Sequence, residues 1–290
     1  MGLCKLAAGG RRNMKTKKIT QDKVVYFLNY IFLTLMLIIV LYPIIYIISC
    51  SFSSGTALMS GKVKLFPVEA TLQSYKAVFE YKAIWVGYRN SIIYTVLGTV
   101  ISVVLTLLAA YPLSREDFRG GKVFMGLFLF TMMFSGGLIP TYLLVKNLGL
   151  VNTMWAVILP GSVSAYNVIV ARTFFKQNIP TELLEAAKVD GCSDFRFFIS
   201  IVIPLSMPIV AVLALWVAVG QWNSYFNPMI YLNSENKYTL QLILRRILLM
   251  SQINLSSSNI DPARIAENQY LSEMLKYATI IISSLPLMLI

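Results

Sequence analysis

The segment Ile179-Pro-Thr-Glu-Leu-Leu-Glu185-Ala186-Ala187-Lys-Val-Asp190-Gly191, followed by Cys192 to Ser200 and Ile201-Val-Ile203-Pro204, decides how the chain folds. This polar stretch lies between two long apolar runs, so we expect it to be a loop outside the bilayer. Pro180 suits the first position of a helix, and the apolar side chains after it recur at helical spacing. Gly191 can adopt the left-handed backbone that ends a helix, and Asp190 and Ser193 can each cap a second one. The sequence therefore predicts a helix-turn-helix within residues 173–204.

The composition is that of an integral membrane protein. Hydrophobic residues make up 57% of the chain and charged residues 13%, and the mean hydropathy is +0.68. A soluble domain of 290 residues could not bury so much apolar surface. The net charge of +12 comes mainly from basic residues that flank apolar runs, which favours a membrane over a nucleic acid as the partner. With no histidine and three scattered cysteines, we expect neither a metal site nor a disulfide framework.

Apolar runs along the chain predict six membrane-spanning helices. They cover about residues 24–50, 91–112, 123–145, 153–171, 197–220 and 277–290. The last run has only 14 residues, fewer than the ~20 that a crossing needs, so we expect the chain to end inside its last helix. The predicted fold class is an all-α polytopic membrane protein with six transmembrane helices and a cytoplasmic helix-turn-helix loop.

The basic residues predict the orientation. Residues 1–23 hold seven lysines and arginines against Asp22 alone, which places this segment in the cytoplasm. Arg115, Arg119 and Lys122 return the chain to that side, and the long loop 233–276 is then external. Because Met14-Lys-Thr-Lys-Lys resembles a natural start, we expect residues 1–13 to have no role in transport.

Several runs carry features beyond a simple crossing. Ser135-Gly-Gly137 should loosen the outer half of the third run, and Pro160-Gly161 should break the fourth. The uncharged stretch continues to Leu232, which predicts a re-entrant or interfacial piece at 221–232. Residues 240–248 alternate with helical spacing between apolar and polar positions, so they predict either an amphipathic interfacial helix or a docking surface.

The opening segment has a spacing that resembles a known family. Glu-Ala-Ala is followed after three residues by Gly191, and after nine more by Ile-x-hydrophobic-Pro, as in the EAA loop of the membrane subunits of bacterial binding-protein-dependent ABC importers. Neighbouring motifs resemble the sugar branch of that family, with closest likeness to permeases for complex oligosaccharides. They are Gly136-Gly-Leu-Ile-Pro140, Leu159-Pro-Gly161, Arg172-Thr-Phe-Phe175, Trp222-Asn223 and Tyr238-Thr-Leu-Gln241. Cys192 departs from the alanine usual in the family.

The resemblance implies an assembly and a role for the loop. It implies a multi-pass permease in the bacterial inner membrane, paired with a second homologous permease, two ATPase subunits and an extracellular sugar-binding protein, for an oligosaccharide substrate. The loop would insert into the ATPase subunit, with Glu185 as the ion-pairing residue and Gly191 as the turn. The expected coupling residues are Glu182, Glu185, Ala186, Ala187, Asp190, Gly191, Ile203 and Pro204.

The chain itself is not expected to be an enzyme. It has no Gly-x-x-x-x-Gly-Lys-Ser/Thr loop, and Gly120-Gly121-Lys122 lacks the first glycine and the hydroxyl residue. We therefore expect no cofactor on this chain and place ATP and magnesium on the ATPase subunits.

Polar and aromatic residues at membrane depth are candidates for the translocation path. Aromatic faces flanked by amides suit sugars, because a pyranose has an apolar face and a rim of hydroxyls. The candidates are Asn90, Tyr94, Tyr166, Asn167, Gln221, Trp222, Asn223, Tyr225 and Asn227. Contacts between helices are the alternative, equally weighted for residues 221–227 and favoured for Ser162 and Ser164.

A rival class is an ion-coupled secondary transporter of small polar solutes. Such a protein would use carboxylates within the membrane, and none of the six predicted spans contains aspartate or glutamate. A membrane-embedded enzyme is disfavoured because there is no histidine and no carboxylate pair at depth.

Overall fold

The structure, a computed structural model, describes residues 3–253 and 262–289, and all regular elements within these residues are helices. The chain divides into two compact units, Met1–Tyr75 and Lys76–Ile290. The helical content agrees with the all-α prediction.

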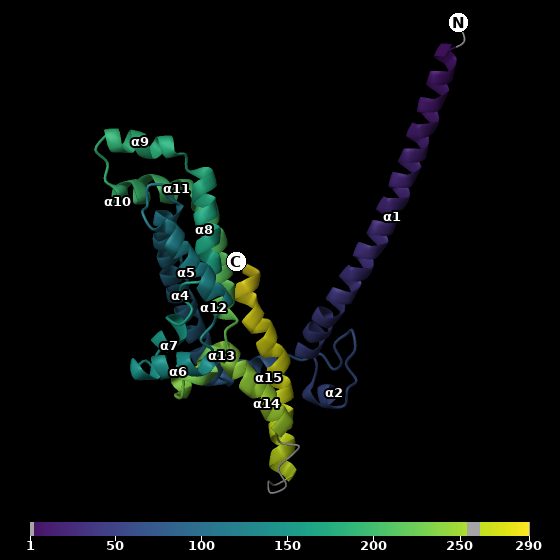
Figure 1. Ribbon diagram of the computed structural model, residues 1–290. Helices are drawn as coiled ribbons and strands as arrows, with labels where there is room; N and C mark the ends of the chain where they lie inside the picture. Colours follow the sequence, from purple (N-terminus) through teal and green to yellow (C-terminus); the bar gives the residue numbers. More distant parts are fainter. Residues whose placement is uncertain (1–2, 254–261, 290) are drawn as a thin grey trace. The chain divides into compact units, whose positions relative to one another are not determined.

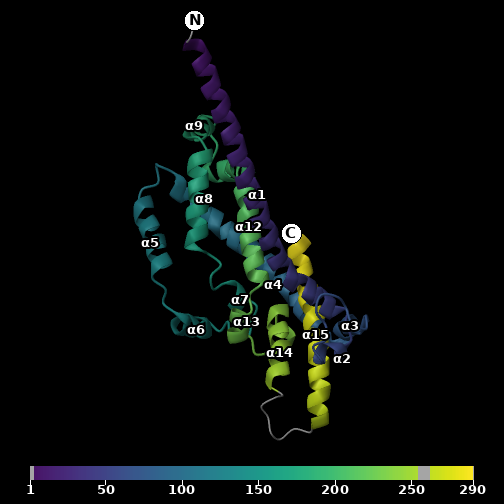
Figure 2. The same cartoon turned by 90° about the vertical axis from the view of Figure 1, so that its right-hand side faces the viewer.

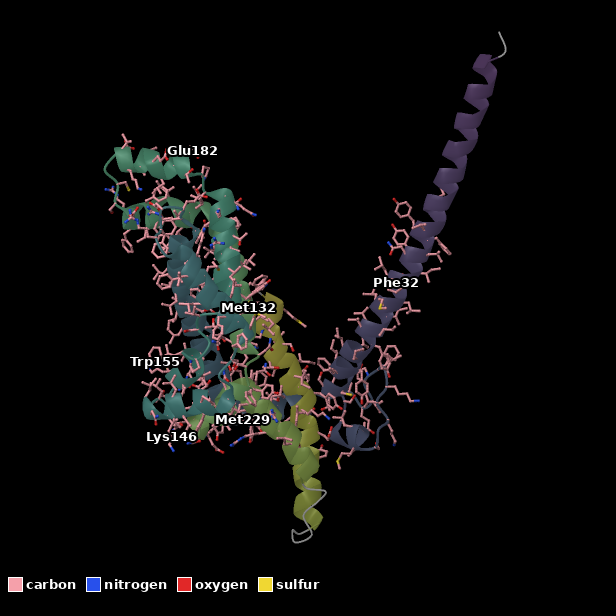
Figure 3. The ribbon with its side chains drawn as sticks, in the orientation of Figure 1. Phe32, Met132, Lys146, Trp155, Glu182 and Met229 are labelled. Atoms are coloured by element: carbon pink, nitrogen blue, oxygen red, sulfur yellow. The ribbon has the colours of Figure 1, made fainter. Side chains whose placement is uncertain are left out.

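The first unit is dominated by α1 (Leu3–Ser51), which continues the first predicted span back through the basic segment (Figure 1). Within it, Val25–Ser51 is long and apolar enough to cross a membrane. Its large apolar side chains are exposed along most of this length, including Phe32, which is labelled in Figure 3. A short helix, α2 (Gly55–Met59), follows after Ser54, whose hydroxyl accepts a hydrogen bond from the Ala57 amide. An apolar helix with no buried face of its own is suited to lipid or to a partner helix.

The second unit is built around α4 (Lys82–Ser114). Its buried residues recur every three or four positions, and many are small: Ile84, Gly87, Asn90, Ser91, Tyr94, Thr95, Gly98, Ser102, Val103, Thr106, Leu107, Ala110 and Leu113. Small residues on a buried face let neighbouring helices approach closely. A Cβ added to Gly87 would lie 2.5 Å from the Cδ1 of Ile243 and 3.1 Å from the Cα of Leu240, so α14 (Leu240–Ile253) crosses α4 at this glycine.

Three further helices surround α4. The helices α8 (Ala165–Asn178) and α12 (Met207–Trp222) pack along it, and α14 packs against both α4 and α15 (Pro262–Leu289), as Figures 1 and 2 show. The main apolar core joins α4, α8 and α12 to residues 187–202. It contains Val103, Leu107, Ala110, Leu113, Val168, Ala171, Phe175, Ala187, Phe197, Phe198, Val202, Ile209 and Leu213.

The third and fourth predicted spans are not continuous helices. In place of 123–145 the chain forms α5 (Gly121–Met133) and α6 (Leu138–Asn147), which are bent from each other by 113°. The break falls at the predicted glycine pair, where Gly137 has φ +85. In place of 153–171 it forms α7 (Trp155–Ile158) and α8, and the break includes the predicted Gly161, with φ +84. Backbone angles of this sign are accessible to glycine at little cost, so both breaks have a local cause.

The fifth predicted span is also bent. The segment from α10 (Asp194–Phe197) through η1 (Phe198–Val202) and α11 (Ile203–Leu205) meets α12 at 80°. Pro204 has no amide hydrogen to complete a helical bond, and η1 before it is widened to a π-helix. In the described residues, two helices can each cross a membrane by length and composition, or four if each bent pair is one span. The count of six spans stays a prediction.

Much of the expected external loop 233–276 is helical. After α13 (Phe226–Tyr231) and the 3₁₀ turn η2 (Glu235–Lys237) come α14 and then α15, which starts at Pro262 rather than near residue 277. A helix at 240–248 is confirmed as α14, and its role as an interfacial helix or a docking surface stays a prediction. Its apolar residues Leu240, Ile243 and Ile247 are buried within the chain, because the helix packs on α4 and α15.

Candidate functional site

The expected helix-turn-helix is present. We call α9 (Thr181–Val189), the turn Asp190–Ser193 and α10 together the knob. Gly191 has φ +72, and its amide donates to the carbonyl of Lys188 at 3.1 Å, so the left-handed turn lies at the predicted residue. Of the two possible caps, Ser193 is the one used, since its hydroxyl accepts from the Arg196 amide. Asp190 is instead an exposed residue that ends α9.

The knob is anchored by one side and exposed on the other. Ala187 is 7% exposed and joins the main core with Phe197, so a larger side chain at this position would push α9 away. On the outside, Val189 is 88% exposed and Phe195 66% exposed. Exposed apolar side chains on a protruding turn are suited to contact with another protein.

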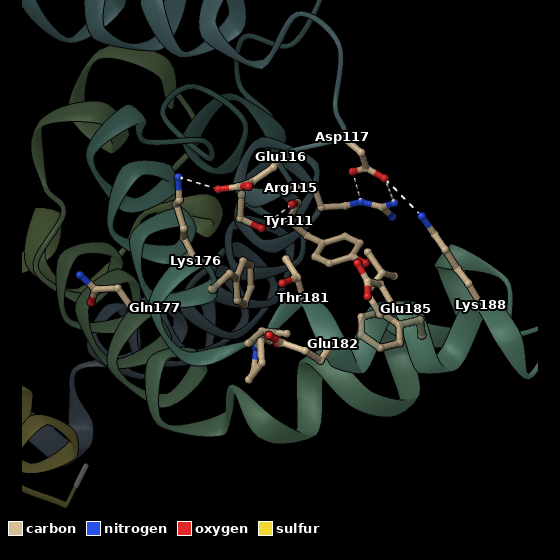
Figure 4. Close-up of a pocket in the computed structure, with 16 residues that line it drawn as sticks. Tyr111, Arg115, Glu116, Asp117, Lys176, Gln177, Thr181, Glu182, Glu185 and Lys188 are labelled. Atoms are coloured by element: carbon tan, nitrogen blue, oxygen red, sulfur yellow. Dashed lines mark hydrogen bonds and ion pairs between the residues drawn. The ribbon is translucent and has the colours of Figure 1, made fainter.

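A groove of about 670 Å³ lies between α9 and the end of α4, and Figure 4 shows its lining. One face of α9 supplies Thr181, Leu184, Glu185 and Lys188, which are spaced three or four residues apart. The aromatic floor contains Tyr111 and Phe175. Glu182 also lines the groove, and it is labelled on α9 in Figure 3. Two of the three acidic residues predicted for coupling, Glu182 and Glu185, therefore lie on one accessible groove, and Asp190 does not line it.

Ion pairs around the groove involve the other charged residues. Arg115 bonds both carboxylate oxygens of Asp117, at 2.8 and 2.5 Å, and Lys188 lies 3.4 Å from the same carboxylate. Lys176 pairs with Glu116 at 3.4 Å. These pairs are dashed in Figure 4. The described residues offer no ion-pair partner to Glu182 or Glu185, so the groove presents two uncompensated carboxylates.

The fork formed by Arg115 holds Asp117 ionised. Hydrogen bonding from Arg115 lowers the pKa of the Asp117 carboxyl to about 2, with a further contribution from Lys188. The pKa of Arg115 is raised above its ordinary value, first by its hydrogen bond to Asp117. Both groups are therefore fully charged at neutral pH.

Ile203 and Pro204 lie beyond the knob, in α11. Pro204 is exposed and Ile203 is partly buried against the main core. They lie just before the bend into α12. They therefore affect the site through the direction in which the chain leaves the knob.

Three of the predicted translocation-path residues donate hydrogen bonds to backbone carbonyls of the chain itself. Asn90 donates from Nδ2 to the carbonyls of Asn236 and Tyr238, at 2.8 and 3.0 Å. Tyr94 donates to the carbonyl of Lys237 at 3.1 Å. Trp222 is 4% exposed and donates to the carbonyl of Ser283 at 3.0 Å. These bonds fit the alternative in which such residues hold helices together.

The other path candidates are more accessible. Tyr166 is 51% exposed, and its ring centroid lies 5.9 Å from that of Trp216, a residue on α12 that the sequence analysis did not single out. Tyr225 is 42% exposed and lies under the guanidinium of Arg245 at 4.7 Å. The remaining four are Asn167, Gln221 and Asn227, which are partly buried, and Asn223, which is exposed. Whether any of them contacts substrate stays a prediction.

Comparison with known proteins identifies the family. Residues 82–290 match the family described as binding-protein-dependent transport system inner membrane component. The chain belongs to this family. The permease is 39% identical over 264 residues to the polygalacturonan/rhamnogalacturonan transport system permease protein YtcP of Bacillus subtilis, covering 91% of each chain. It is 32% identical over 218 residues to the arabinooligosaccharides transport system permease protein AraQ of Halalkalibacterium halodurans, covering 72% of the permease and 77% of that relative.

A solved structure supports the fold. The permease matches one chain of a bacterial ABC transporter involved in the import of the acidic polysaccharide alginate with a TM-score of 0.82 and 33% identity, covering 93% of the permease and 94% of that chain. The all-α membrane fold and the resemblance drawn from the Glu-Ala-Ala spacing are thereby confirmed. The protein is a bacterial membrane permease of the sugar ABC transporter type.

Residues 115–117 were missed as part of the site. Sequence reasoning used Arg115 only to orient the chain, although Arg-Glu-Asp directly after an apolar span is a compact set of charges next to a predicted turn. The contact with Asp194, 79 residues later, could not be read from spacing.

Proposed function

We propose that this permease forms, with a second homologous permease, the path for an oligosaccharide delivered by an extracellular binding protein. The knob couples that path to ATP hydrolysis by two separate ATPase subunits. The observation that carries the proposal is the pair of uncompensated carboxylates, Glu182 and Glu185, in the groove of a protruding helix-turn-helix.

The groove suits a basic side chain of the ATPase subunit. Every cation that lines it is already paired with Glu116 or Asp117, so neither α9 carboxylate is neutralised from within the described part of the chain. A lysine or arginine entering from a partner would meet them in a partly desolvated space, where an ion pair is stronger than at an open surface. Val189 and Phe195 supply apolar contacts beside this pair.

The substrate class follows from the relatives. Their printed names concern polygalacturonan, rhamnogalacturonan and arabinooligosaccharides, and the structural relative is involved in alginate import. Tyr166 and Trp216 offer exposed aromatic faces on adjacent helices, and such faces suit the apolar side of a sugar ring. ATP and magnesium belong to the ATPase subunits, and this chain is a non-catalytic component.

The proposed orientation places the knob and the N-terminal segment in the cytoplasm. Lysines and arginines concentrate before the first span and after α4, which is the arrangement that the positive-inside rule describes.

The test of coupling is Glu185→Gln, which keeps the side chain's shape and removes its charge. Loss of one member of a partly buried ion pair costs ~2 to 5 kcal/mol, so ATPase association should weaken by at least about 30-fold. Glu182→Gln reports whether the second carboxylate shares the partner. Glu80→Gln, an exposed residue of α3 (Gln73–Glu80) outside the groove, is the control for general loss of negative charge.

The readouts are pull-down of the matched ATPase subunits and uptake with the matched binding protein. Equal, small effects of all three substitutions would show that Glu185 is only a solvated helix residue. Uptake by the purified permease without any ATPase would overturn the proposal and favour an ion-coupled transporter.

A further inference from the structure

We propose that Arg115 is a positioning residue that fastens the knob to the end of α4, so that the two move as one body during transport. This inference rests on the proposed function of the knob. It concerns a residue outside the Glu-Ala-Ala segment, in the loop that follows α4.

All three guanidinium nitrogens of Arg115 donate hydrogen bonds to carboxylates. Nε and one terminal nitrogen bond the two oxygens of Asp117, and the other terminal nitrogen bonds Asp194 at 2.5 Å. Asp194 is the first residue of α10, while Asp117 also receives Lys188 from α9. One arginine therefore connects the loop after α4 to both helices of the knob.

The arginine is held more firmly than a surface ion pair. Its side chain is 15% exposed, whereas those of Asp117 and Asp194 are 50% and 63% exposed. The guanidinium lies 5.9 Å from the centroid of the Tyr111 ring, whose centroid in turn lies 4.9 Å from that of Phe198 in the core, with the two rings tilted by 31°. A planar, bidentate arginine resting on a ring loses little further freedom when it binds a second carboxylate.

The end of α4 is itself fixed. Arg115 terminates the helix, and its amide donates to the carbonyl of Pro112 at 3.2 Å. Nearby, Nε of Arg172 on α8 donates to the carbonyl of Leu113 at 2.8 Å, which satisfies one of the carbonyls left free where a helix ends. Displacement of the knob therefore transmits force to α4 and α8 through short, directed bonds rather than through a flexible loop.

Without the arginine, the connection becomes repulsive. Among the described residues, Asp117 and Asp194 would then have no cation between them, and Lys188, at 3.4 Å from Asp117, would be the one cation left on that side. Lysine at position 115 would keep a charge but could not bind two carboxylates with a fork. The geometry thus predicts that the knob is held most firmly with arginine at position 115, less firmly with lysine and least firmly with alanine.

The experiment compares the wild-type permease with Arg115→Lys and Arg115→Ala in the full complex with its ATPase subunits. Lys276→Met is the control, because it removes an ion pair, with Glu273 at 3.6 Å, that lies in α15 and outside the groove. We expect Arg115→Ala to lower the ratio of substrate-stimulated to basal ATP hydrolysis at least fivefold, Arg115→Lys about twofold, and Lys276→Met not measurably. Pull-down of the ATPase subunits should change less than twofold in all three.

A second readout does not depend on activity. Cys192 lies at the knob's turn and is partly buried against the core, so release of the knob should speed its alkylation in Arg115→Ala several-fold, with peptide mass spectrometry identifying the labelled cysteine. Normal stimulation and normal Cys192 labelling in Arg115→Ala would overturn the inference. So would parallel loss of folded protein and ATPase binding, which would indicate general destabilisation. If Glu185→Gln uncouples transport while Arg115→Ala does not, the proposed function stands and only this inference fails.

Discussion

The two ends of α4 are held by different kinds of interaction. At its C-terminal end, the knob is joined to the helix by the ion pairs of Arg115 with Asp117 and Asp194, and Arg115 and Asp117 line the open groove. In its N-terminal half, buried uncharged groups hold the segment 233–240: Asn90 and Tyr94 donate to backbone carbonyls there, and Ser91 accepts from the amide of Leu240. We call this second region the asparagine lock, and it includes Asn152.

Asn152 completes the lock. Its Oδ1 accepts from the amides of Asn233 and Ser234, both at 3.1 Å, and its Nδ2 donates to the hydroxyl of Ser234 at 2.8 Å. Its own backbone has φ +61, a conformation that asparagine tolerates better than most residues. The Asn152 bonds are exposed or partly buried, whereas those of Asn90 to Tyr238 and of Leu240 to Ser91 are buried. Neutral bonds to backbone groups give one fixed arrangement, since any slip leaves those groups unpaired. The difference suggests that the lock holds one fixed arrangement, whereas the ion pairs at the knob end can rearrange when a partner binds.

The largest effect expected at the knob end is that of Gly191→Pro. Proline cannot adopt φ +72, and it removes the amide that bonds the carbonyl of Lys188, so the turn cannot form. We expect substrate-stimulated ATP hydrolysis to be abolished while the asparagine lock is unaffected. Gly191→Asn, which can occupy the left-handed region, should retain most of the stimulation. Normal stimulation in Gly191→Pro would show that this turn is not the coupling element.

The matching change in the lock is Asn90→Leu, which keeps the approximate volume. It leaves the carbonyls of Asn236 and Tyr238 without their donor, and each buried unsatisfied group costs ~1 to 3 kcal/mol. We expect a clear loss of thermal stability in detergent, with the coupling ratio of the surviving folded protein unchanged. Asn223→Leu is the control, because among the described residues the side-chain amide of Asn223, the C-cap of α12, bonds the carbonyl of Val219 one turn earlier and no other element. Lost uptake at unchanged stability would instead place Asn90 in the translocation path.

The knob was predictable because its determinants are local. Gly191 and Ser193 act through their own backbone geometry or through a residue three positions away, and both are where the sequence places them. Pro180 was predicted at the first helical position and is instead the N-cap of α9, one residue earlier. The broken spans had local signals too, at Gly137 and Gly161, although a glycine marks the place of a break and not the 113° angle between α5 and α6.

The lock and Arg115 were not predictable in the same way. Asn90 looks like a path residue because amides suit sugars, yet its partners lie 146 and 148 residues later. The chemistry of an amide is the same whether it meets a hydroxyl of a sugar or a backbone carbonyl, so only the fold distinguishes the two roles. Likewise the start of α15 at Pro262 extends into a stretch too polar to be called a span, because a helix that packs on α14 does not need an apolar surface all round.

Salt and pH should affect the two ends of α4 differently, and these effects should be smaller than those of the substitutions above. Raising the ionic strength from about 0.1 M to 1 M shortens the screening length from about 10 Å to 3 Å, which weakens half-exposed pairs such as Lys188 with Asp117 far more than buried neutral bonds. We expect hydrogen exchange of the amides in the knob's turn to rise a few-fold, while exchange of the Leu240 amide, which donates to the buried Ser91 hydroxyl, stays constant. Equal responses at the two ends would show that the knob end is not more responsive than the asparagine lock.

The pH dependence follows from the direction of the Asp117 shift. Its folded-state pKa of about 2 lies below the ~3.9 of an unfolded chain, so the stabilising contribution is complete above about pH 4 and is lost as the pH falls toward 2. The chain has no histidine to titrate between these values and neutrality. Exchange at the knob's turn should therefore be flat from pH 5 to 8 after correction for the intrinsic rate, and should increase only below pH 4. Asp117→Asn, which cannot titrate, should show the faster exchange at every pH. A step in the wild type near pH 6 would mean that some group other than Asp117 controls how firmly Arg115 holds the knob.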